Sequence, residues 1–321
     1  MKIDRPGLFK GMTAEDYFSD PAPEGFPSLS QSLCKILIEQ SPLHARQAHP
    51  RLAEPIDGDG EDDDAVEKYD KAKAIGNAAH LIMMGRGKRL DVIDAKDFRT
   101  KTAQSDKEAA LQRGAEPILR KHYFTAHAMT LAAKLQISSI PGCERAFREG
   151  DGEVVVISNE DGQWLRSMID WITPDLREVW DLKTSGMSAS PYNTGKQMAS
   201  AGWHLQAAMH ERILDAIDPE GAGRRKFRYV CQENEPPFAL TVNEIGESAL
   251  TIGRKQIDFA IKTWRYCVAS DLWPAYPLRI IRPELPGWAE NAWIDREIAE
   301  YEAEQAAGPR KDFDPKNLMA G

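Results

Sequence analysis

The sequence predicts a mixed α+β fold in which one mixed sheet packs between helices. Residues 152–184 are rich in Val, Ile and Trp and carry the turn signals Asn-Glu-Asp-Gly and Thr-Pro-Asp, which is typical of a three-stranded meander. Segments with helical spacing of apolar residues lie on both sides of this meander along the chain. With 321 residues and 42% apolar content, the chain can bury a substantial core, and we expect one domain over residues 28–306.

The segments before the meander are predicted to be mostly helical. Residues 1–27 are rich in proline and glycine, show little periodicity and are expected to form an extended arm that lies on the domain. A helix follows at 29–40, capped by Ser28 or Ser30, and ends at the next Ser-Pro pair. Further helices are predicted at 68–85, 104–121 and 123–136, and the polar stretch 86–101 is predicted to be a basic loop.

Helix and strand alternate after the meander. A helix is predicted at 203–217, and two strands at 226–235 and 238–245 are separated by a Pro-Pro turn. Two more helices are predicted at 245–270 and 288–306, followed by a polar tail at 307–321 that we expect to be disordered.

Charge and cysteine content narrow the class of protein. The net charge is -9, but residues 57–67 carry seven acidic side chains and no basic one, which indicates a solvated acidic loop in an otherwise nearly balanced chain. The four cysteines, Cys34, Cys143, Cys231 and Cys267, form no CxxC pair and are expected to be core thiols. Neither a signal peptide nor an apolar run of membrane-spanning length is evident, so we expect a cytoplasmic protein.

The residues with most chemical content are Asp170 and the run Asp181-Leu182-Lys183. Alternate side chains of a strand share a face, so Asp181 and Lys183 are expected to project together while Leu182 turns into the core. A hairpin between the two strands would bring Asp170 beside Asp181, and such oxygen ligands suit Mg²⁺ or Mn²⁺. The alternative is that these charges form surface ion pairs near a turn; the apolar Val and Trp that precede Asp181 favour the first interpretation.

These residues resemble a known family. The stretches RSMIDWI, EVWDLKTS and AIGNAAHLIMMG resemble the motifs of PD-(D/E)XK nucleases of the RecB type and of the exodeoxyribonuclease VIII (RecE) type. The stretches SLSQSLCKILIEQSPLHAR, DFRTKTAQSDKEAA, WHLQAAMH and VCQENEPPFAL resemble further landmarks of RecE-like proteins, so that the resemblance covers residues 28–276. It implies a restriction-endonuclease-like core with a central mixed sheet flanked by helices.

The resemblance also implies roles for individual residues. Asp170, Asp181 and the main-chain carbonyl of Leu182 would bind the metal, and His80 would be a helix-borne ligand. A lone His in an apolar helix is otherwise more often a core residue with one hydrogen bond. Lys183 would orient or deprotonate the attacking water and neutralise developing charge.

Two further residues match family positions, and a third departs from the family pattern. Glu144 corresponds to a glutamate near the metal, although a surface salt bridge is an equal alternative. Gln206 corresponds to the glutamine of a Gln-x-x-x-Tyr pattern. The fourth following position is His210 here, which places a direct tyrosine contact to DNA in doubt. Because residues four apart share a helix face, we expect His210 to point to the site beside Gln206 and to be a candidate for DNA contact.

The implied activity is Mg²⁺-dependent 5′ to 3′ digestion of one strand of linear duplex DNA, which leaves a 3′ overhang for recombination. The implied partners are double-stranded DNA ends, a RecT-type strand-annealing protein and further copies of the chain, with which it would form a tetrameric ring. The protein would act in the cytoplasm and would be encoded by a bacterium or a phage. Two basic clusters are candidates for contacts to DNA phosphates; the alternative is that they are ordinary surface charges. The first cluster is Arg86, Lys88, Arg89, Arg99 and Lys101. The second cluster is Arg224, Arg225, Lys226 and Arg228.

Other functions remain open on the sequence. The same fold supports endonucleases and flap nucleases, because a fold hosts many activities. A catalytically silent DNA-binding subunit is a second alternative, against which the retention of His80, Asp170, Asp181 and Lys183 argues.

Overall fold

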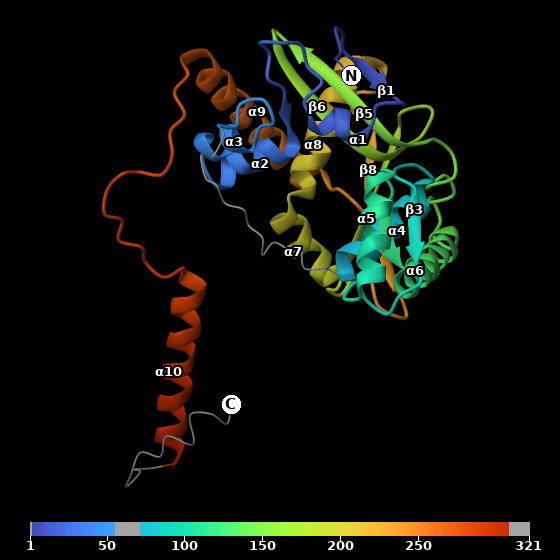
Figure 1. The fold of residues 1–321 in the computed structure, drawn as a ribbon. Helices are drawn as coiled ribbons and strands as arrows, with labels where there is room; N and C mark the ends of the chain where they lie inside the picture. The colour runs from blue at the N-terminus through green and yellow to red at the C-terminus, as the bar shows by residue number, and fades with distance from the viewer. Residues whose placement is uncertain (1, 55–70, 308–321) are drawn as a thin grey trace. The chain divides into compact units, whose positions relative to one another are not determined.

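A computed structural model of the protein describes residues 2–54 and 71–307, and the chain divides into two compact units, Met1–Tyr276 and Pro277–Gly321 (Figure 1). The predicted acidic loop at 57–67 lies outside the described residues, as does nearly all of the predicted tail. The predicted domain boundaries stay a prediction, while residues 2–27 belong to the first compact unit.

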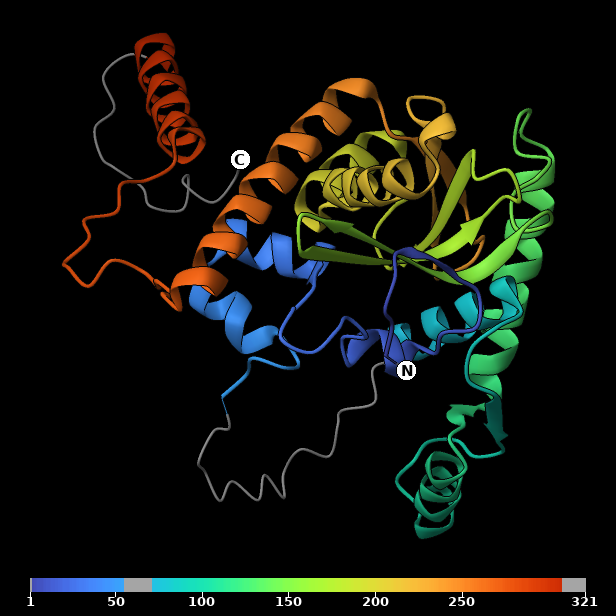
Figure 2. The ribbon, with the colours of Figure 1, turned by 90° about the horizontal axis from the view of Figure 1, so that it is seen from above.

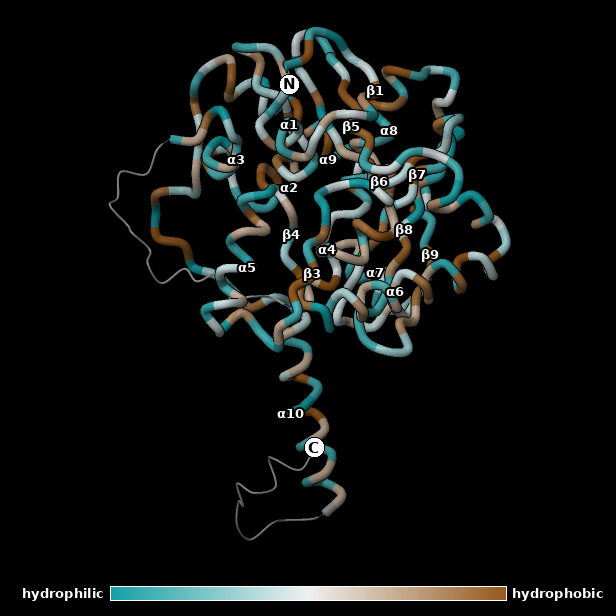
Figure 3. The backbone as a smooth tube through the Cα atoms, turned by 45° about the vertical axis from the view of Figure 1, so that its right-hand side comes forward, coloured by the Kyte–Doolittle hydropathy of each residue, from teal (hydrophilic) through white to brown (hydrophobic). Residues whose placement is uncertain are grey.

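The first unit is built on one mixed sheet, as predicted. Within the described residues its seven strands run in the order β1 (Gly7–Phe9), β5 (Asp151–Glu160), β6 (Gln163–Ile172), β7 (Glu178–Ser185), β8 (Lys226–Glu233) and β9 (Leu240–Glu244), with β2 (Leu29–Ser30) paired to β6. β5, β6 and β7 form the predicted antiparallel meander. β8 pairs with β7 in parallel and with β9 antiparallel, and hydrophobic segments run through β5 and β8 (Figure 3).

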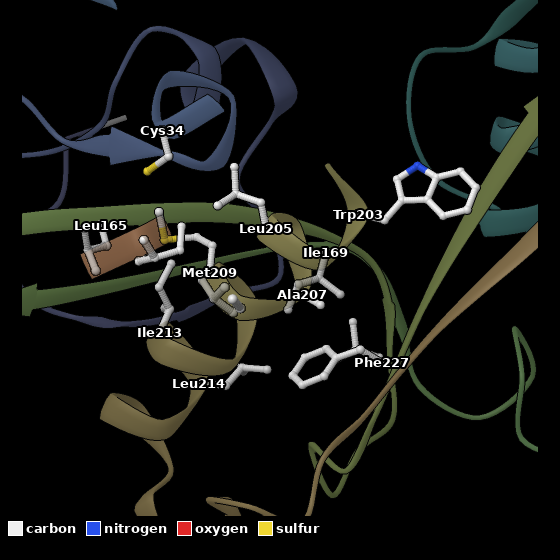
Figure 4. Packing of buried hydrophobic residues seen from close by; sticks show 14 of the residues in the cluster. Cys34, Leu165, Ile169, Trp203, Leu205, Ala207, Met209, Ile213, Leu214 and Phe227 are labelled. Carbon is white, nitrogen blue, oxygen red and sulfur yellow. The ribbon is translucent and has the colours of Figure 1, made fainter. Parts of the chain in front are cut away.

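Helices α8 (Trp203–Ile217) and α9 (Glu247–Ser270) cover one face of the sheet (Figure 2). Their buried side chains pack with those of α2 (Gln31–Glu39) and of β5 and β6 into the largest apolar cluster of the described chain. Figure 4 shows Met209 and Ile213 of α8 close to Leu165 of β6. The side-chain hydroxyl of Ser30 accepts from the amide of Leu33, which confirms the predicted cap of α2, and α3 (Pro42–Ala48) starts at the Ser-Pro pair.

The other face is covered by α4 (Lys71–Met84), α6 (Arg120–Ser138) and the N-terminal arm, which includes α1 (Ala14–Phe18) (Figure 2). Met83 and Met84 of α4 pack with Trp180 and Leu182 of the sheet. Ile3 of the arm packs against the same sheet with Val155 and Trp164 as neighbours, among others. The arm is therefore part of the packed unit.

Two segments differ from the prediction. The predicted loop at 86–101 contains β3 (Leu90–Ile93), and the predicted helix at 104–121 is α5 (Lys101–Gln112) followed by β4 (Glu116–Leu119), which pairs in parallel with β3. The helix ends because Gly114 has φ 69°, a left-handed conformation that stops an α-helix. The sequence prediction also missed α7 (Pro191–Ala201), which begins with proline in its first turn, and the short 3₁₀ turn η1 (Pro219–Gly221).

The second unit contains α10 (Gly287–Ala307), in agreement with the predicted helix at 288–306. All four cysteines are buried and unpaired, which confirms the prediction of core thiols. Among the described helices, none is both long enough and apolar enough to span a bilayer.

Candidate active site

The candidate site lies where β6 and β7 separate. The two strands pair only at Trp171 with Trp180 and at Ile172 with Val179. Beyond these pairs the amide of Leu182 donates instead to Asp170 Oδ2, at 3.1 Å. Because the N–H and C=O of one residue in a strand point to the same edge, the carbonyl of Leu182 also faces this gap.

A network of charged and amide groups occupies the β7 side of the gap. Lys183 Nζ lies 2.8 Å from Asp181 Oδ1, so the two side chains project together as predicted. Gln206 of α8 joins them: its Nε2 donates to Asp181 Oδ2 at 2.8 Å, and its Oε1 accepts from Lys183 Nζ at 3.3 Å. Leu182 turns the other way, into the apolar cluster that contains Met83.

His80 enters the site from α4. Its Nε2 lies 3.0 Å from Asp170 Oδ2, so it contacts the predicted ligand set rather than the apolar core. The approach of α4 depends on Gly76, one helical turn earlier, because a Cβ there would lie 2.5 Å from Thr184 Oγ1 of β7. The absence of a side chain at Gly76 thus allows His80 to reach the gap between the strands.

The four charged groups perturb one another. Burial would raise the pKa of Asp170, but the charges of His80 and Lys183 outweigh it and lower that pKa. Burial and then the charge of Asp170 raise the pKa of Asp181. Burial would lower the pKa of Lys183, but Asp181 and Asp170 outweigh it, so that pKa is raised and the lysine is held protonated. Such clusters of perturbed groups are typical of active sites.

The residues present fit a divalent cation. Across residues 2–54 and 71–307, no three His, Cys, Asp or Glu side chains already have the spacing of a preformed metal site. The donors are nevertheless of the right kind: Asp181 Oδ1 is buried and accepts no well-oriented hydrogen bond, although Lys183 Nζ is near, and the Leu182 carbonyl faces the same gap. Together with Asp170 and His80 they offer oxygen and imidazole ligands for Mg²⁺ or Mn²⁺.

One residue near the site was not predicted from the sequence. Glu153 of β5 lies across from Asp170, and its Oε1 is 3.9 Å from His80 Nδ1. A further glutamate had been predicted here at Glu144, but Glu144 is exposed and accepts from the amide of Gly142, in a loop that lines a separate pocket with residues of α6. The hydrogen bonds and ion pairs of the described residues do not join Glu144 to His80, Asp170, Asp181 or Lys183.

The side chain of His210 is buried in the structure. It shares a face of α8 with Gln206, but its side chain is 1% exposed and its ring lies 6.5 Å from that of Phe227. Burial lowers the pKa of His210 to about 4, so the imidazole is neutral. This placement is at odds with a direct contact between His210 and a phosphate.

The first basic cluster is close to the site. Arg86 and Lys88 line a groove of about 720 Å³ together with His80 and Glu153, and Lys10 of the arm lines it too. Arg86 donates to the carbonyl of Lys10 at 2.6 Å, which fixes one wall. The remaining members of the cluster, Arg89, Arg99 and Lys101, are exposed. Of these, Arg89 forms an ion pair with Asp91.

The second basic cluster is largely structural. The guanidinium of Arg225 is buried and pairs with Asp215 and Asp218. Arg228 pairs with Glu178 and lies over the ring of Trp180, 4.8 Å from its centroid. Only Arg224 and Lys226 of this cluster are exposed in the structure.

A mixed sheet that carries paired aspartates and a lysine at a strand divergence, with helices on both faces, defines a nuclease-like α/β core of the PD-(D/E)XK class. The sequence match agrees: residues 58–279 match the family described as a PDDEXK-like domain of unknown function (DUF3799), and the chain belongs to this family. The prediction of a PD-(D/E)XK protein is therefore confirmed, as is the fold class.

Similar solved structures support the fold. A protein described as a "putative exonuclease" from Eubacterium rectale superposes with a TM-score of 0.51 at 10% identity, covering 86% of this chain and 96% of that one. The structures of SSO0001 (16% identity, 63% of this chain and 96% of that one) and of Rai1 from Scheffersomyces stipitis (12%, 61% and 58%) both have TM-scores of 0.26, too low to support an argument. No curated protein matches the sequence.

Proposed function

We propose that the protein is a Mg²⁺-dependent exodeoxyribonuclease that digests one strand of linear duplex DNA from 5′ to 3′ and leaves a 3′ overhang. The observation that carries the proposal is the convergence of His80, Asp170, Asp181 and Lys183 in the gap between β6 and β7. The family match and the described activity of the Eubacterium rectale protein support a nuclease.

The residues would divide the chemistry between them. Asp170, Asp181, the Leu182 carbonyl and His80 would hold the cation, which when bound polarises a phosphate and favours formation of hydroxide from water. Lys183, held by Asp181 at 2.8 Å, would orient the attacking water and neutralise charge that develops on the phosphate. Gln206 fixes the position of Lys183 relative to Asp181.

Digestion of end-labelled linear duplex DNA with Mg²⁺ tests this proposal. We expect wild type to release label placed at the 5′ ends before label placed at the 3′ ends, and to leave a closed circular duplex intact. Asp181→Ala and Lys183→Ala should abolish digestion, whereas Asp258→Ala and Lys255→Ala, which change exposed charges on α9, should not. Cleavage of the circle would indicate an endonuclease, and a wild type that binds DNA without digesting it would indicate a silent subunit.

The proposal includes assembly and partners, which rest on the resemblance alone. We expect a tetrameric ring around DNA and association with a RecT-type annealing protein. Light scattering on purified full-length protein should give a mass four times that of one chain. A monomer at micromolar concentration, with and without a DNA end, would contradict the ring.

A further inference from the structure

Glu153 has a backbone conformation that is unusual for its place in a strand. It lies in β5 with φ 50°, between Gly152, which pairs with Trp171, and Val154, which pairs with Ile169. The register therefore sets Glu153 across from Asp170, although the two do not form a regular pair. Residues with side chains rarely adopt positive φ, and they keep it only where the surrounding structure imposes it, often at functional sites.

The side chain of Glu153 faces His80 from the side away from Asp170. His80 Nδ1 is 3.9 Å from Glu153 Oε1, and His80 Nε2 is 3.0 Å from Asp170 Oδ2, so the imidazole lies between two carboxylates. The carboxylate of Glu153 also lies near Gly87, where a Cβ would overlap Leu81 Cδ2 and would meet Glu153 Oε1 at 3.3 Å. Gly87, with φ 110°, thereby leaves space for both side chains.

We propose that Glu153 is a positioning residue, which holds the His80 ring with its proton on Nδ1 and leaves Nε2 free to bind the cation. The inference rests on the proposed metal-dependent function. A neutral histidine binds metal through the nitrogen that carries no proton, and a carboxylate beside the other nitrogen fixes that tautomer and the ring orientation. Glu153 Oε1 lies 3.9 Å from Nδ1, the nitrogen that does not face Asp170, so Glu153 is placed to act through His80.

Calorimetric titration of full-length protein with Mn²⁺, without DNA, measures the effect directly. Loss of a carboxylate partner of a ligating histidine typically weakens metal affinity about 10- to 100-fold, and we expect this for Glu153→Ala. Glu153→Gln should lose less, because its side-chain amide oxygen can still lie beside Nδ1. The matched control is Glu149→Gln, which changes an exposed carboxylate four residues upstream and should bind as wild type does.

A double variant separates action through His80 from independent action. If Glu153 acts through His80, then His80→Ala/Glu153→Ala should bind Mn²⁺ no more weakly than His80→Ala alone. A further loss in the double variant, equal to that of Glu153→Ala in the wild-type background, would show that Glu153 acts by itself and would overturn the inference. Unchanged affinity in Glu153→Ala would overturn it as well.

Two more variants keep the result interpretable. Glu153→Gly accepts φ 50° without strain, so it should melt no lower than Glu153→Ala and should lose affinity to the same degree. Retention of wild-type affinity in Glu153→Gly would contradict the inference. If His80→Ala and Asp181→Ala both bind Mn²⁺ as wild type does, the metal site of the proposed function fails; if they lose binding while Glu153→Ala does not, only the positioning role fails.

Discussion

At the scale of single residues, Gln206 joins the two charged members of the Asp181-Leu182-Lys183 run through one carboxamide. Its nitrogen donates to Asp181 and its oxygen accepts from Lys183, so the side chain fixes the distance between carboxylate and ammonium. Neither charged group can then rotate away without breaking a hydrogen bond inside a mostly buried network. Gln206 is thus the clearest positioning residue for the proposed chemistry.

Replacement of Gln206 should reduce turnover while the fold is kept. We expect Gln206→Ala to lower kcat on linear duplex about 10- to 100-fold, the range found when a partner that orients a ligand is removed. The measurement is kcat at saturating Mg²⁺ and DNA, with a thermal melt of each variant. Gln47→Ala, at an exposed position of α3, is the matched control. A turnover equal to wild type would mean that the bridge is not needed.

The site residues that the sequence could predict are those whose side-chain direction follows from the local geometry of a strand or helix. Asp181 and Lys183 share a strand face because alternate side chains do, and a two-strand hairpin brings Asp170 to them. Glu153 could not be predicted, because the direction of its side chain depends on a positive φ for which the sequence carries no signal. His210 does share a helix face with Gln206, as predicted, but at His210 this face is buried, with Phe227 of β8 as a neighbour.

At the scale of secondary-structure elements, the contact between α4 and β7 determines where His80 lies. Gly76 and His80 are one turn apart on the same face of α4, and Gly76 touches Thr184. A methyl group at Gly76 would push the helix away from the strand. The displacement would carry His80 away from Asp170.

A substitution and its rescue test this contact. We expect Gly76→Ala to destabilise the protein by about 1–3 kcal/mol, as overpacking commonly does, and to reduce nuclease activity. Thr184→Ala removes the Oγ1 atom that a Cβ would meet at 2.5 Å, so Gly76→Ala/Thr184→Ala should recover both stability and activity. Thermal melting and DNA digestion measure the two effects. If the double variant is no better than Gly76→Ala, another contact limits the approach of α4.

The N-terminal arm is fastened by a buried ion cluster. Asp20 is fully buried and lies 3.2 Å from His49 Nε2 of the segment after α3, 3.1 Å from Arg51 Nε and 3.2 Å from Arg166 NH1 of β6. Its carboxylate also accepts from the hydroxyl of Ser28 at 2.5 Å. The carboxylate of Asp20 therefore connects the N-terminal arm to the segment after α3 and to the sheet.

Neutralising the carboxylate of Asp20 should weaken the attachment of the arm and so destabilise the protein. Burial would raise the pKa of Asp20, but His49 and Arg166 outweigh it and hold that pKa well below its usual range. The stabilisation is therefore complete above the unfolded pKa of about 4 and is lost as pH falls. We expect Asp20→Asn to lower the unfolding free energy by roughly 3–5 kcal/mol at pH 7 and by progressively less below pH 4, in urea titrations. A pH-independent difference would assign the effect to packing.

The elements that the sequence predicted well are long and carry strong local signals. The helix at 203–217 shows the 3.6-residue period, and the strands of the meander are rich in Val, Ile and Trp and bounded by turn signals; they appear as α8 and β5 to β7. The four-residue strands β3 and β4 are too short to show a period, and they form by pairing with each other across α5. Only a contact distant in sequence defines them.

At the scale of the whole molecule, a net charge of -9 has to be reconciled with binding to DNA. The charge that matters is local and exposed: Lys10, Arg86 and Lys88 line the groove that also contains His80, together with Glu15, Glu116 and Glu153. Lys10 and Arg86 pair with Asp151 but stay largely exposed, whereas the side chains of Arg225 and Arg228 are buried in their ion pairs. Phosphate contacts are therefore expected on the α4 side of the site rather than around β8.

The salt dependence of DNA binding tests where these contacts lie. Each phosphate contact contributes about 0.9 to the slope of log affinity against log salt, because bound counterions are released from the duplex. We expect Lys88→Ala to reduce the slope by about 1 and Arg86→Ala/Lys88→Ala by about 2, measured by fluorescence anisotropy on a linear duplex with Ca²⁺ in place of Mg²⁺ to slow digestion. Lys255→Ala on α9 should leave the slope unchanged. If Arg224→Ala/Lys226→Ala lowers the slope while Arg86→Ala/Lys88→Ala does not, the DNA lies along β8 and the groove beside His80 is not its path.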